Sequence, residues 1–175
     1  MLAIKLVQGC AERLPFKNSF FDLVFCVNAI HHFDHPHMFI YEAYRVLSAY
    51  GTLAVIGTEP HGQKDSWYGF HFFEGTYETD LKRFPAWETV SDWMIQAGLR
   101  IIEIKRGREV LKDPYLRKNA CSRLALLSDE AYNAGLESIE AAIAQAEARG
   151  ETIVFRTDML ISMLTGYKAG SSAVD

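Results

Sequence analysis

The chain has 175 residues, of which 49% are hydrophobic and 23% are charged. This length and composition are typical of one ordinary globular domain that can bury a core. A net charge of −4 at pH 7, without a long stripe of Lys and Arg, argues against a nucleic-acid partner. The sequence has no segment that approaches the ~20 consecutive apolar residues of a membrane span, so we expect no membrane partner.

The cysteines favour a reducing compartment. Cys10, Cys26 and Cys121 are odd in number and irregular in spacing, which does not predict a disulfide framework. Cys26 lies within an apolar run, where a buried thiol behaves as a small hydrophobic side chain. The N-terminus has no charged region followed by a long apolar stretch. We therefore expect a cytoplasmic protein with reduced cysteines.

The N-terminal third of the chain alternates strand and helix patterns. Residues 3–8 predict a short strand, and the continuous apolar run at 22–28 predicts a strand covered on both faces. Asp34 or His35 then caps a helix with Pro36 in its first turn. A second apolar run at 52–57 completes a βαβ unit, which we expect to cross over right-handed.

Residues 59–84 break this alternation because no period recurs and aromatic side chains accumulate. The segment is either a lid that faces a substrate or a loop or poorly amphipathic helix laid over the sheet, and the sequence favours neither. If it is a lid, we expect four of its residues to form an aromatic wall for the substrate: Trp67, Tyr68, His71 and Phe72.

The second half of the chain returns to regular patterns. Helical spacing at 86–97 ends at Gly98, and Ser128 caps a helix that Gly150 ends. The remaining elements that we expect are a strand at 99–105, a helix from Asp113-Pro114 to about residue 127, and a strand at 152–165.

The most specific motif is the run Gly9-Cys10-Ala11-Glu12-Arg13-Leu14-Pro15-Phe16, followed by NSFFD at 18–22 and by HHFD at 31–34. Residues 8–58 resemble the central block of class I S-adenosylmethionine-dependent methyltransferases of the small-molecule type, which includes enzymes of ubiquinone biosynthesis. The resemblance runs from about residue 3 to 107, and residues 108–168 match only loosely.

The resemblance implies an α/β fold. We expect a single methyltransferase-like domain over 1–175, with a Rossmann-like sheet that is mostly parallel, an antiparallel C-terminal hairpin and helices on both faces. Its parts are the central block at 1–58, the lid-like segment at 59–84, helices and hairpin at 85–168 and a tail at 169–175. In the family a first strand, a Gly-rich loop and an acidic residue precede the block, so we expect a truncated form of this sheet.

The resemblance also implies S-adenosylmethionine as the cofactor. It assigns Cys10, Ala11 and Glu12 to cofactor binding. We add Asn28, Ala29 and Ile30, because ligands of parallel sheets bind outside the carboxyl ends of the strands. The family usually has Asp where this chain has Cys10, and losing such a hydrogen-bond acceptor costs about 1–3 kcal/mol. None of the 12 glycines makes a G-x-G pair. We therefore expect this chain alone to bind the cofactor weakly or not at all.

His31 and His32 are the candidate catalytic residues. Either could act as a general base toward the methyl acceptor; the alternative is one histidine packed under the loop and one exposed. A metal site over His31–His37 is a further hypothesis. We do not favour a metal, because the HHFD stretch is common in the resembled family and no Cys or His at diagnostic spacing joins it from elsewhere.

The sequence thus favours a methyltransferase family member that acts on a small molecule and is impaired or inactive as this chain alone. The alternative is a non-catalytic remnant that self-associates or binds a ligand. Whether the chain is an enzyme, and which methyl acceptor it uses, stay open. We expect a homodimer whose interface involves 2–8 and 20–28, because an apolar strand without a neighbour is an aggregation hazard.

Overall fold

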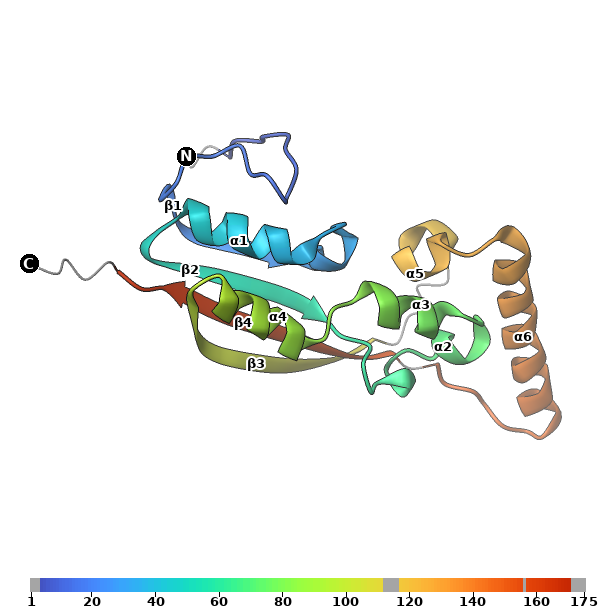
Figure 1. The fold of residues 1–175 in the computed structure, drawn as a ribbon. Coiled ribbons are helices and arrows are strands. Elements are labelled where there is room, and N and C mark those ends of the chain that lie inside the picture. The colour runs from blue at the N-terminus through green and yellow to red at the C-terminus, as the bar shows by residue number, and fades with distance from the viewer. Residues whose placement is uncertain (1–3, 112–116, 156, 171–175) are drawn as a thin grey trace, which may run out of the picture. The chain divides into compact units, whose positions relative to one another are not determined.

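A computed structural model describes residues 4–111, 117–155 and 157–170 (Figure 1). Its contacts divide the chain into two compact units. Unit 1 contains Met1–Gly57, Ala86–Lys105 and Ser162–Asp175, and unit 2 contains Thr58–Pro85 and Arg106–Ile161. The elements in chain order are β1 (Phe21–Val27), η1 (Ile30–His32), α1 (Pro36–Val46), β2 (Leu47–Thr58), η2 (Lys64–Ser66), α2 (Gly69–Phe72), α3 (Thr76–Arg83), α4 (Trp87–Gln96), β3 (Leu99–Leu111), η3 (Lys118–Ala120), α5 (Ser122–Ala125), α6 (Asp129–Ala148) and β4 (Thr157–Lys168).

The strands form one mixed sheet in the order β1-β2-β4-β3. β1 pairs with β2 in parallel, with Leu23 opposite Thr52 and Val27 opposite Ile56. β3 and β4 run antiparallel. Gly166 lies against Leu99 near the start of β3, and Thr165, one residue earlier in β4, donates its hydroxyl to the carbonyl of Glu103, which lies later in β3. The expected α/β class, with parallel strands and an antiparallel C-terminal hairpin, is confirmed.

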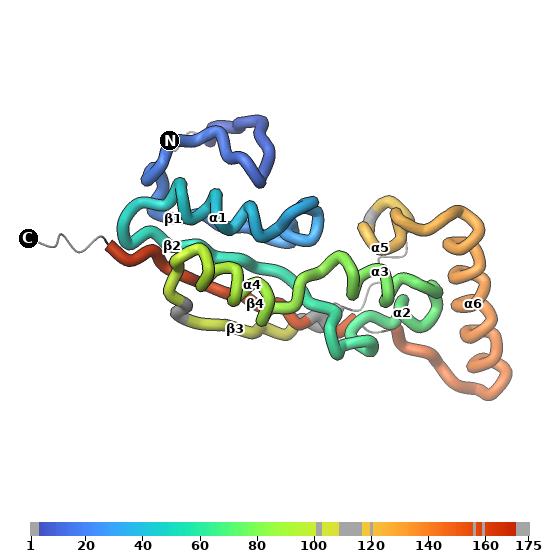
Figure 2. Tube along the Cα trace, in the orientation of Figure 1, coloured from blue at the N-terminus to red at the C-terminus, as the bar shows by residue number. Residues whose placement is uncertain are grey.

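Helices α1 and α4 pack on the sheet of unit 1 (Figures 1 and 2). Pro36 stands in the first turn of α1, where proline loses no hydrogen bond. The buried face of α1 recurs at helical spacing, and α4 buries three residues at similar spacing. Gly98, at φ +97°, ends the turn after α4 in a conformation that favours glycine. The helix residues in the unit 1 core are Phe39, Ile40, Ala43, Trp87, Val90 and Met94.

Strand β1 has one covered face and one exposed face. Cys26 is buried in the unit 1 core, and burial raises the pKa of its thiol. On the opposite face Leu23, Phe25 and Val27 are 55%, 65% and 48% exposed. β1 also lies at one edge of the sheet that the described residues form. The apolar edge agrees with expectation, but the expectation that 22–28 is covered on both faces was wrong, because one face is exposed.

Unit 2 has an aromatic core of its own. Trp67, Phe70 and Phe73 are buried, and α6 packs against this cluster through Ile139. Asp80, which is fully buried, forms ion pairs with Arg83 and Arg123. Within 59–84, residues 69–72 and 76–83 form the short helices α2 and α3, which agrees with the helical alternative; a role as a lid stays a prediction.

Three expected elements need correction. Residues 4–8 form no strand; Ile4 and Leu6 are 89% and 95% exposed there, without a neighbouring ladder to pair with. The expected helix up to residue 127 is reduced to η3 and α5, and residues 112–116 lie outside the described ranges. The last strand begins at Thr157 rather than at residue 152. No helix in the described ranges has the length and apolar character needed to cross a bilayer.

Candidate functional site

The motif loop at 9–16 folds into a tight turn. The Arg13 amide donates to the Cys10 carbonyl at 3.1 Å. The loop doubles back so closely that a Cβ at Gly9 would lie 2.8 Å from Cδ of Pro15, which explains the glycine. Ala11 packs against the unit 1 core, while the Cys10 thiol is exposed. The loop thus has one anchored side and one free side.

The second group of predicted cofactor residues follows the carboxyl end of β1. Asn28 has φ +47°, a left-handed conformation that Asn tolerates better than most residues. Its amide donates to the Ile56 carbonyl at 2.8 Å. A Cβ at Gly57 would lie 3.3 Å from Asn28 Oδ1, so glycine leaves room for this side chain. Ligands of parallel sheets bind outside such strand ends, and the strained residue marks this position.

A single hydrogen bond links the motif loop to helix α1. The Glu12 carboxylate accepts from the His35 amide at 2.7 Å. His35 is the N-cap residue of α1 and makes no side-chain cap of its own. Glu12 therefore caps the helix from 23 residues away, at the end where the helix dipole favours a negative charge. Neither Asp34 nor the His35 side chain, the two caps that we expected, performs this role.

His31 and His32 lie in the η1 turn that follows Asn28 and Ala29. Their ring centroids are 4.1 Å apart, and the His32 amide donates to the Ala29 carbonyl at 2.9 Å. His31 is half-buried and His32 is exposed. This arrangement agrees with one packed and one solvent-facing ring, and the general-base role stays a prediction. Within the described ranges, no three His, Cys, Asp or Glu side chains gather as metal ligands would.

The four predicted substrate residues all lie in unit 2. Trp67 and Tyr68 are buried in its aromatic core, and Phe72 is half-buried beside that core. His71 is exposed, and its Nε2 lies 3.0 Å from Asp65 Oδ1. Their role as a substrate wall stays a prediction.

A cavity of about 430 Å³ opens in unit 2 next to this segment. Five of its seven lining residues are polar or charged, and Arg108 forms an ion pair with Asp158 there. The Asp65 carboxylate that faces His71 also lines it, so the cavity touches the predicted substrate segment at one residue. The lining residues are Gly62, Gln63, Asp65, Ser66, Arg108, Asp158 and Leu160.

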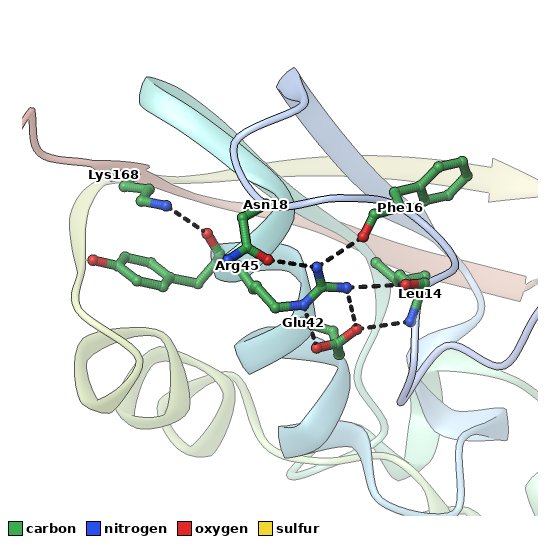
Figure 3. Close-up of polar contacts among 7 residues, drawn as sticks. Leu14, Phe16, Asn18, Glu42, Arg45 and Lys168 are labelled. Atoms are coloured by element: carbon green, nitrogen blue, oxygen red, sulfur yellow. Dashed lines mark hydrogen bonds and ion pairs between the residues drawn. The ribbon is translucent and has the colours of Figure 1, made fainter.

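Sequence reasoning missed two charged residues on α1 that hold the motif loop. Glu42 and Arg45 are three positions apart on the helix and contact Leu14, Phe16 and Asn18 (Figure 3). The i,i+3 spacing of a carboxylate and a guanidinium predicts at most a surface ion pair. No local signal indicated that the partner would be a loop about 28 residues earlier in the chain.

The described residues fit the adenine end of S-adenosylmethionine better than its amino-acid end. Ala11 and Ala29 are partly buried and offer apolar contact surface, whereas Ile30 is buried in the unit 1 core; the Cys10 thiol is a weak hydrogen-bond group at the exposed turn. A close backbone approach to the amino-acid end requires glycines at short spacing, and the 175 residues contain no G-x-G. The fit is therefore partial.

Comparison with known proteins shows that the chain is similar in sequence to methyltransferases. Residues 1–55 match the methyltransferase domain family. The chain is 30% identical over 102 residues to 2-methyl-6-phytyl-1,4-hydroquinone methyltransferase of Arabidopsis thaliana, an alignment that covers 58% of this chain and 28% of that protein. It is 38% identical over 64 residues to phthiotriol/phenolphthiotriol dimycocerosates methyltransferase of Mycobacterium leprae, covering 37% and 24%. The chain thus spans about a quarter of the length of these curated relatives.

The fold of the chain is similar to that of solved methyltransferase structures. A candidate methyltransferase of Bacillus halodurans C-125 superposes with a TM-score of 0.63 at 21% identity, covering 95% of this chain and 78% of that one. A candidate methyltransferase of an antibiotic biosynthesis pathway in Anabaena variabilis gives a TM-score of 0.66 at 18% identity, covering 90% and 71%. The chain therefore has a Rossmann-like methyltransferase fold, and its N-terminal third is similar in sequence to the methyltransferase domain family.

Proposed function

We propose that this protein takes part in methyl transfer from S-adenosylmethionine to a small-molecule acceptor, and that the described site holds the adenine end of the cofactor. One observation carries the proposal. The motif loop at 9–16 is folded and anchored on helix α1, which follows the carboxyl end of β1, in a chain whose residues 1–55 match the family. Each of the two curated relatives described above is named as the methyltransferase of a small molecule, which supports this acceptor class.

Methyl transfer depends mainly on the alignment of the reacting groups. When bound, S-adenosylmethionine supplies an electrophilic methyl group, and the transfer is a displacement that depends on the geometry of nucleophile, carbon and leaving group. The residues of this chain would contribute by holding the adenine end beside Ala11 and Asn28. The exposed His32 ring is available to take a proton from the acceptor.

We propose further that the 175-residue chain by itself binds the cofactor with a dissociation constant above about 10 μM, which corresponds to less than roughly 6.8 kcal/mol. The absence of a G-x-G pair and the thiol of Cys10 at the position of the family's carboxylate support this proposal.

The test is ligand-induced stabilisation of the purified chain by millimolar S-adenosylhomocysteine. A ligand at ten times its dissociation constant stabilises the fold by about 1.4 kcal/mol, which a thermal melt resolves. We expect Asn28→Ala combined with His32→Ala to abolish this stabilisation. Equal stabilisation of the parent and the double variant would remove these residues from the site, and calorimetric binding tighter than 10 μM would contradict weak binding.

A second candidate function rests on a different observation. Leu23, Phe25 and Val27 expose an apolar strand face that a monomeric protein normally covers. A module that self-associates or binds a ligand without catalysis would use this face. Such a module would show no response to S-adenosylhomocysteine, which distinguishes it from the methyltransferase.

A cytoplasmic location is also part of the proposal, supported by the free state of Cys10, Cys26 and Cys121.

A further inference from the structure

Arg45 uses every N–H group of its guanidinium. Nε donates to Glu42 Oε1 at 2.7 Å. Nη1 donates to the Phe16 carbonyl and to Asn18 Oδ1, both at 2.8 Å. Nη2 donates to the Leu14 carbonyl at 2.9 Å and to Glu42 Oε2 at 2.7 Å. These are the five donors that an arginine side chain has, and three of the five bonds go to residues 14–18, at and just after the end of the motif loop (Figure 3).

Glu42 completes the arrangement from the same helix. Its Oε2 accepts from the Leu14 amide at 2.8 Å, so Leu14 is held through both its N–H and its C=O. The hydrogen bond from Arg45 lowers the pKa of the Glu42 carboxyl below its ordinary value of 4.5, and the Leu14 amide acts in the same direction. The side chains of Arg45 and Glu42 are 31% and 17% exposed. The group is therefore shielded more than a typical surface ion pair.

The anchoring extends to both sides of the bound segment. On one side Glu12 accepts from the His35 amide at the start of α1. On the other, the Ser19 amide donates to the Arg45 carbonyl at 3.0 Å, and the Phe20 amide donates to the Val46 carbonyl at 2.7 Å. Helix α1 thus fixes the loop from the predicted adenine contacts up to the start of β1.

We propose that Glu42 and Arg45 are positioning residues for the cofactor: together they hold the loop so that Cys10, Ala11 and Glu12 face the adenine end. This inference rests on the proposed function and deepens it. Neither side chain needs to touch the ligand. They act by fixing the backbone of Leu14 and Phe16, directly after the contact residues.

Arginine is specific for this task. A lysine carries the same charge, but it offers three donors from one nitrogen and cannot reproduce a planar fork that reaches two carbonyls, an amide oxygen and a carboxylate. Arg45→Lys therefore keeps the charge and removes the geometry. Glu42→Gln keeps the shape and removes the charge, and Gln keeps one oxygen that can accept from the Leu14 amide.

The test compares amide hydrogen exchange, read by NMR, at Leu14 and Phe16 in the full chain, which needs no ligand. We expect Arg45→Lys to speed exchange at both amides at least tenfold, and Glu42→Gln to speed it at Leu14 by a smaller factor, because the Gln oxygen can still accept from that amide. Val90→Ala is the matched control, because Val90 on α4 is fully buried in the unit 1 core and is not a partner in the hydrogen bonds by which Glu42 and Arg45 hold the loop. It should lower stability without a selective effect on the loop amides.

Each outcome decides the proposal. Exchange at Leu14 that is unchanged in Arg45→Lys, or that rises equally in Val90→Ala, overturns it. If Arg45→Lys does not fold, Asn18→Ala removes one acceptor from the loop side and should speed exchange at Phe16 to a smaller extent. The ligand enters in a separate arm, with S-adenosylhomocysteine as the probe. If the probe protects the loop in the parent chain, Arg45→Lys must weaken that protection, and equal protection refutes positioning. A loop that loosens in the variant but is never protected by the probe supports the anchor and refutes the proposed cofactor site.

Discussion

Replacing Gly135 with alanine sets two physical effects against each other in unit 2. Gly135 lies within helix α6 and is buried. A Cβ at this position would lie 2.2, 2.5 and 2.9 Å from Cδ1, Cε1 and Cγ of Phe73. Phe73 is fully buried, and its ring stacks with Tyr132 at 5.9 Å and with Trp67 at 6.3 Å between centroids. The ring therefore has neighbours that oppose its retreat.

The magnitudes favour the clash. Alanine is better than glycine in a helix interior by about 1 kcal/mol. Overpacking a filled core costs about 1–3 kcal/mol, and a contact as short as 2.2 Å with a ring that cannot move places this case at the upper end. The net expectation is a loss of about 2 kcal/mol in the free energy of unfolding, which lowers the melting temperature by roughly 4–8 °C for a chain of this size.

Thermal unfolding followed by circular dichroism measures the effect, and the near-ultraviolet signal reports the packing of the aromatic cluster. Asn133→Ala is the control, because Asn133 is exposed on the same helix and should gain a few tenths of a kcal/mol from propensity alone. A Gly135→Ala variant at least as stable as the parent would refute the reasoning. It would mean that the segment containing Phe73 yields, as a lid would, instead of forming a fixed core.

Three further predictions follow from the site and the exposed strand. Cys10→Asp restores the carboxylate of the family motif and should tighten S-adenosylhomocysteine binding about tenfold, or about 1.4 kcal/mol, in an NMR titration; Cys10→Ser is the control, and an equal gain in both contradicts the role of the carboxylate. Glu42→Gln should lower the free energy of unfolding in urea at pH 7. Because Arg45 lowers the folded pKa of Glu42, the stabilisation is complete above the ordinary value of 4.5 and is lost as the pH falls through the lowered value, so the two proteins should converge in acid; a difference independent of pH would count against this. Light scattering should give about twice the 19.8 kDa chain mass, and Phe25→Lys should return the monomer; a monomeric parent at micromolar concentration would contradict self-association through β1.

The elements that local chemistry specifies were predicted well. Pro36 begins α1, and Ser128 caps α6, where its hydroxyl accepts from the Ala131 amide at 3.1 Å. Gly98 and Gly150 end their helices with positive φ. Each of these signals acts within one turn of chain, so the sequence contains both partners of the interaction. The motif at 9–16 was equally readable, because the resemblance lies in consecutive residues.

The errors occurred where a segment needs a distant partner. An apolar run such as 3–8 becomes a strand only if a neighbouring strand offers its hydrogen bonds, and residues 4–8 have none among the described elements. The last strand, expected from residue 152, begins at Thr157. The burial of Trp67 and Tyr68 could not be predicted either, because it depends on contacts with Phe155 and other residues far along the chain; their role as a substrate wall stays a prediction.

The sequence by itself determined the resemblance to methyltransferases, the ends of α1, α4 and α6 and the location of the motif loop, because these depend on residues close together in the chain. Only the tertiary structure decided what holds that loop. Leu14 and Glu42 are 28 positions apart, and Leu14 and Arg45 are 31 apart. A charged pair on a helix looks the same in sequence whether it faces water or a folded loop. Its function depends on the orientation of α1 against the loop, which packing across the whole of unit 1 fixes.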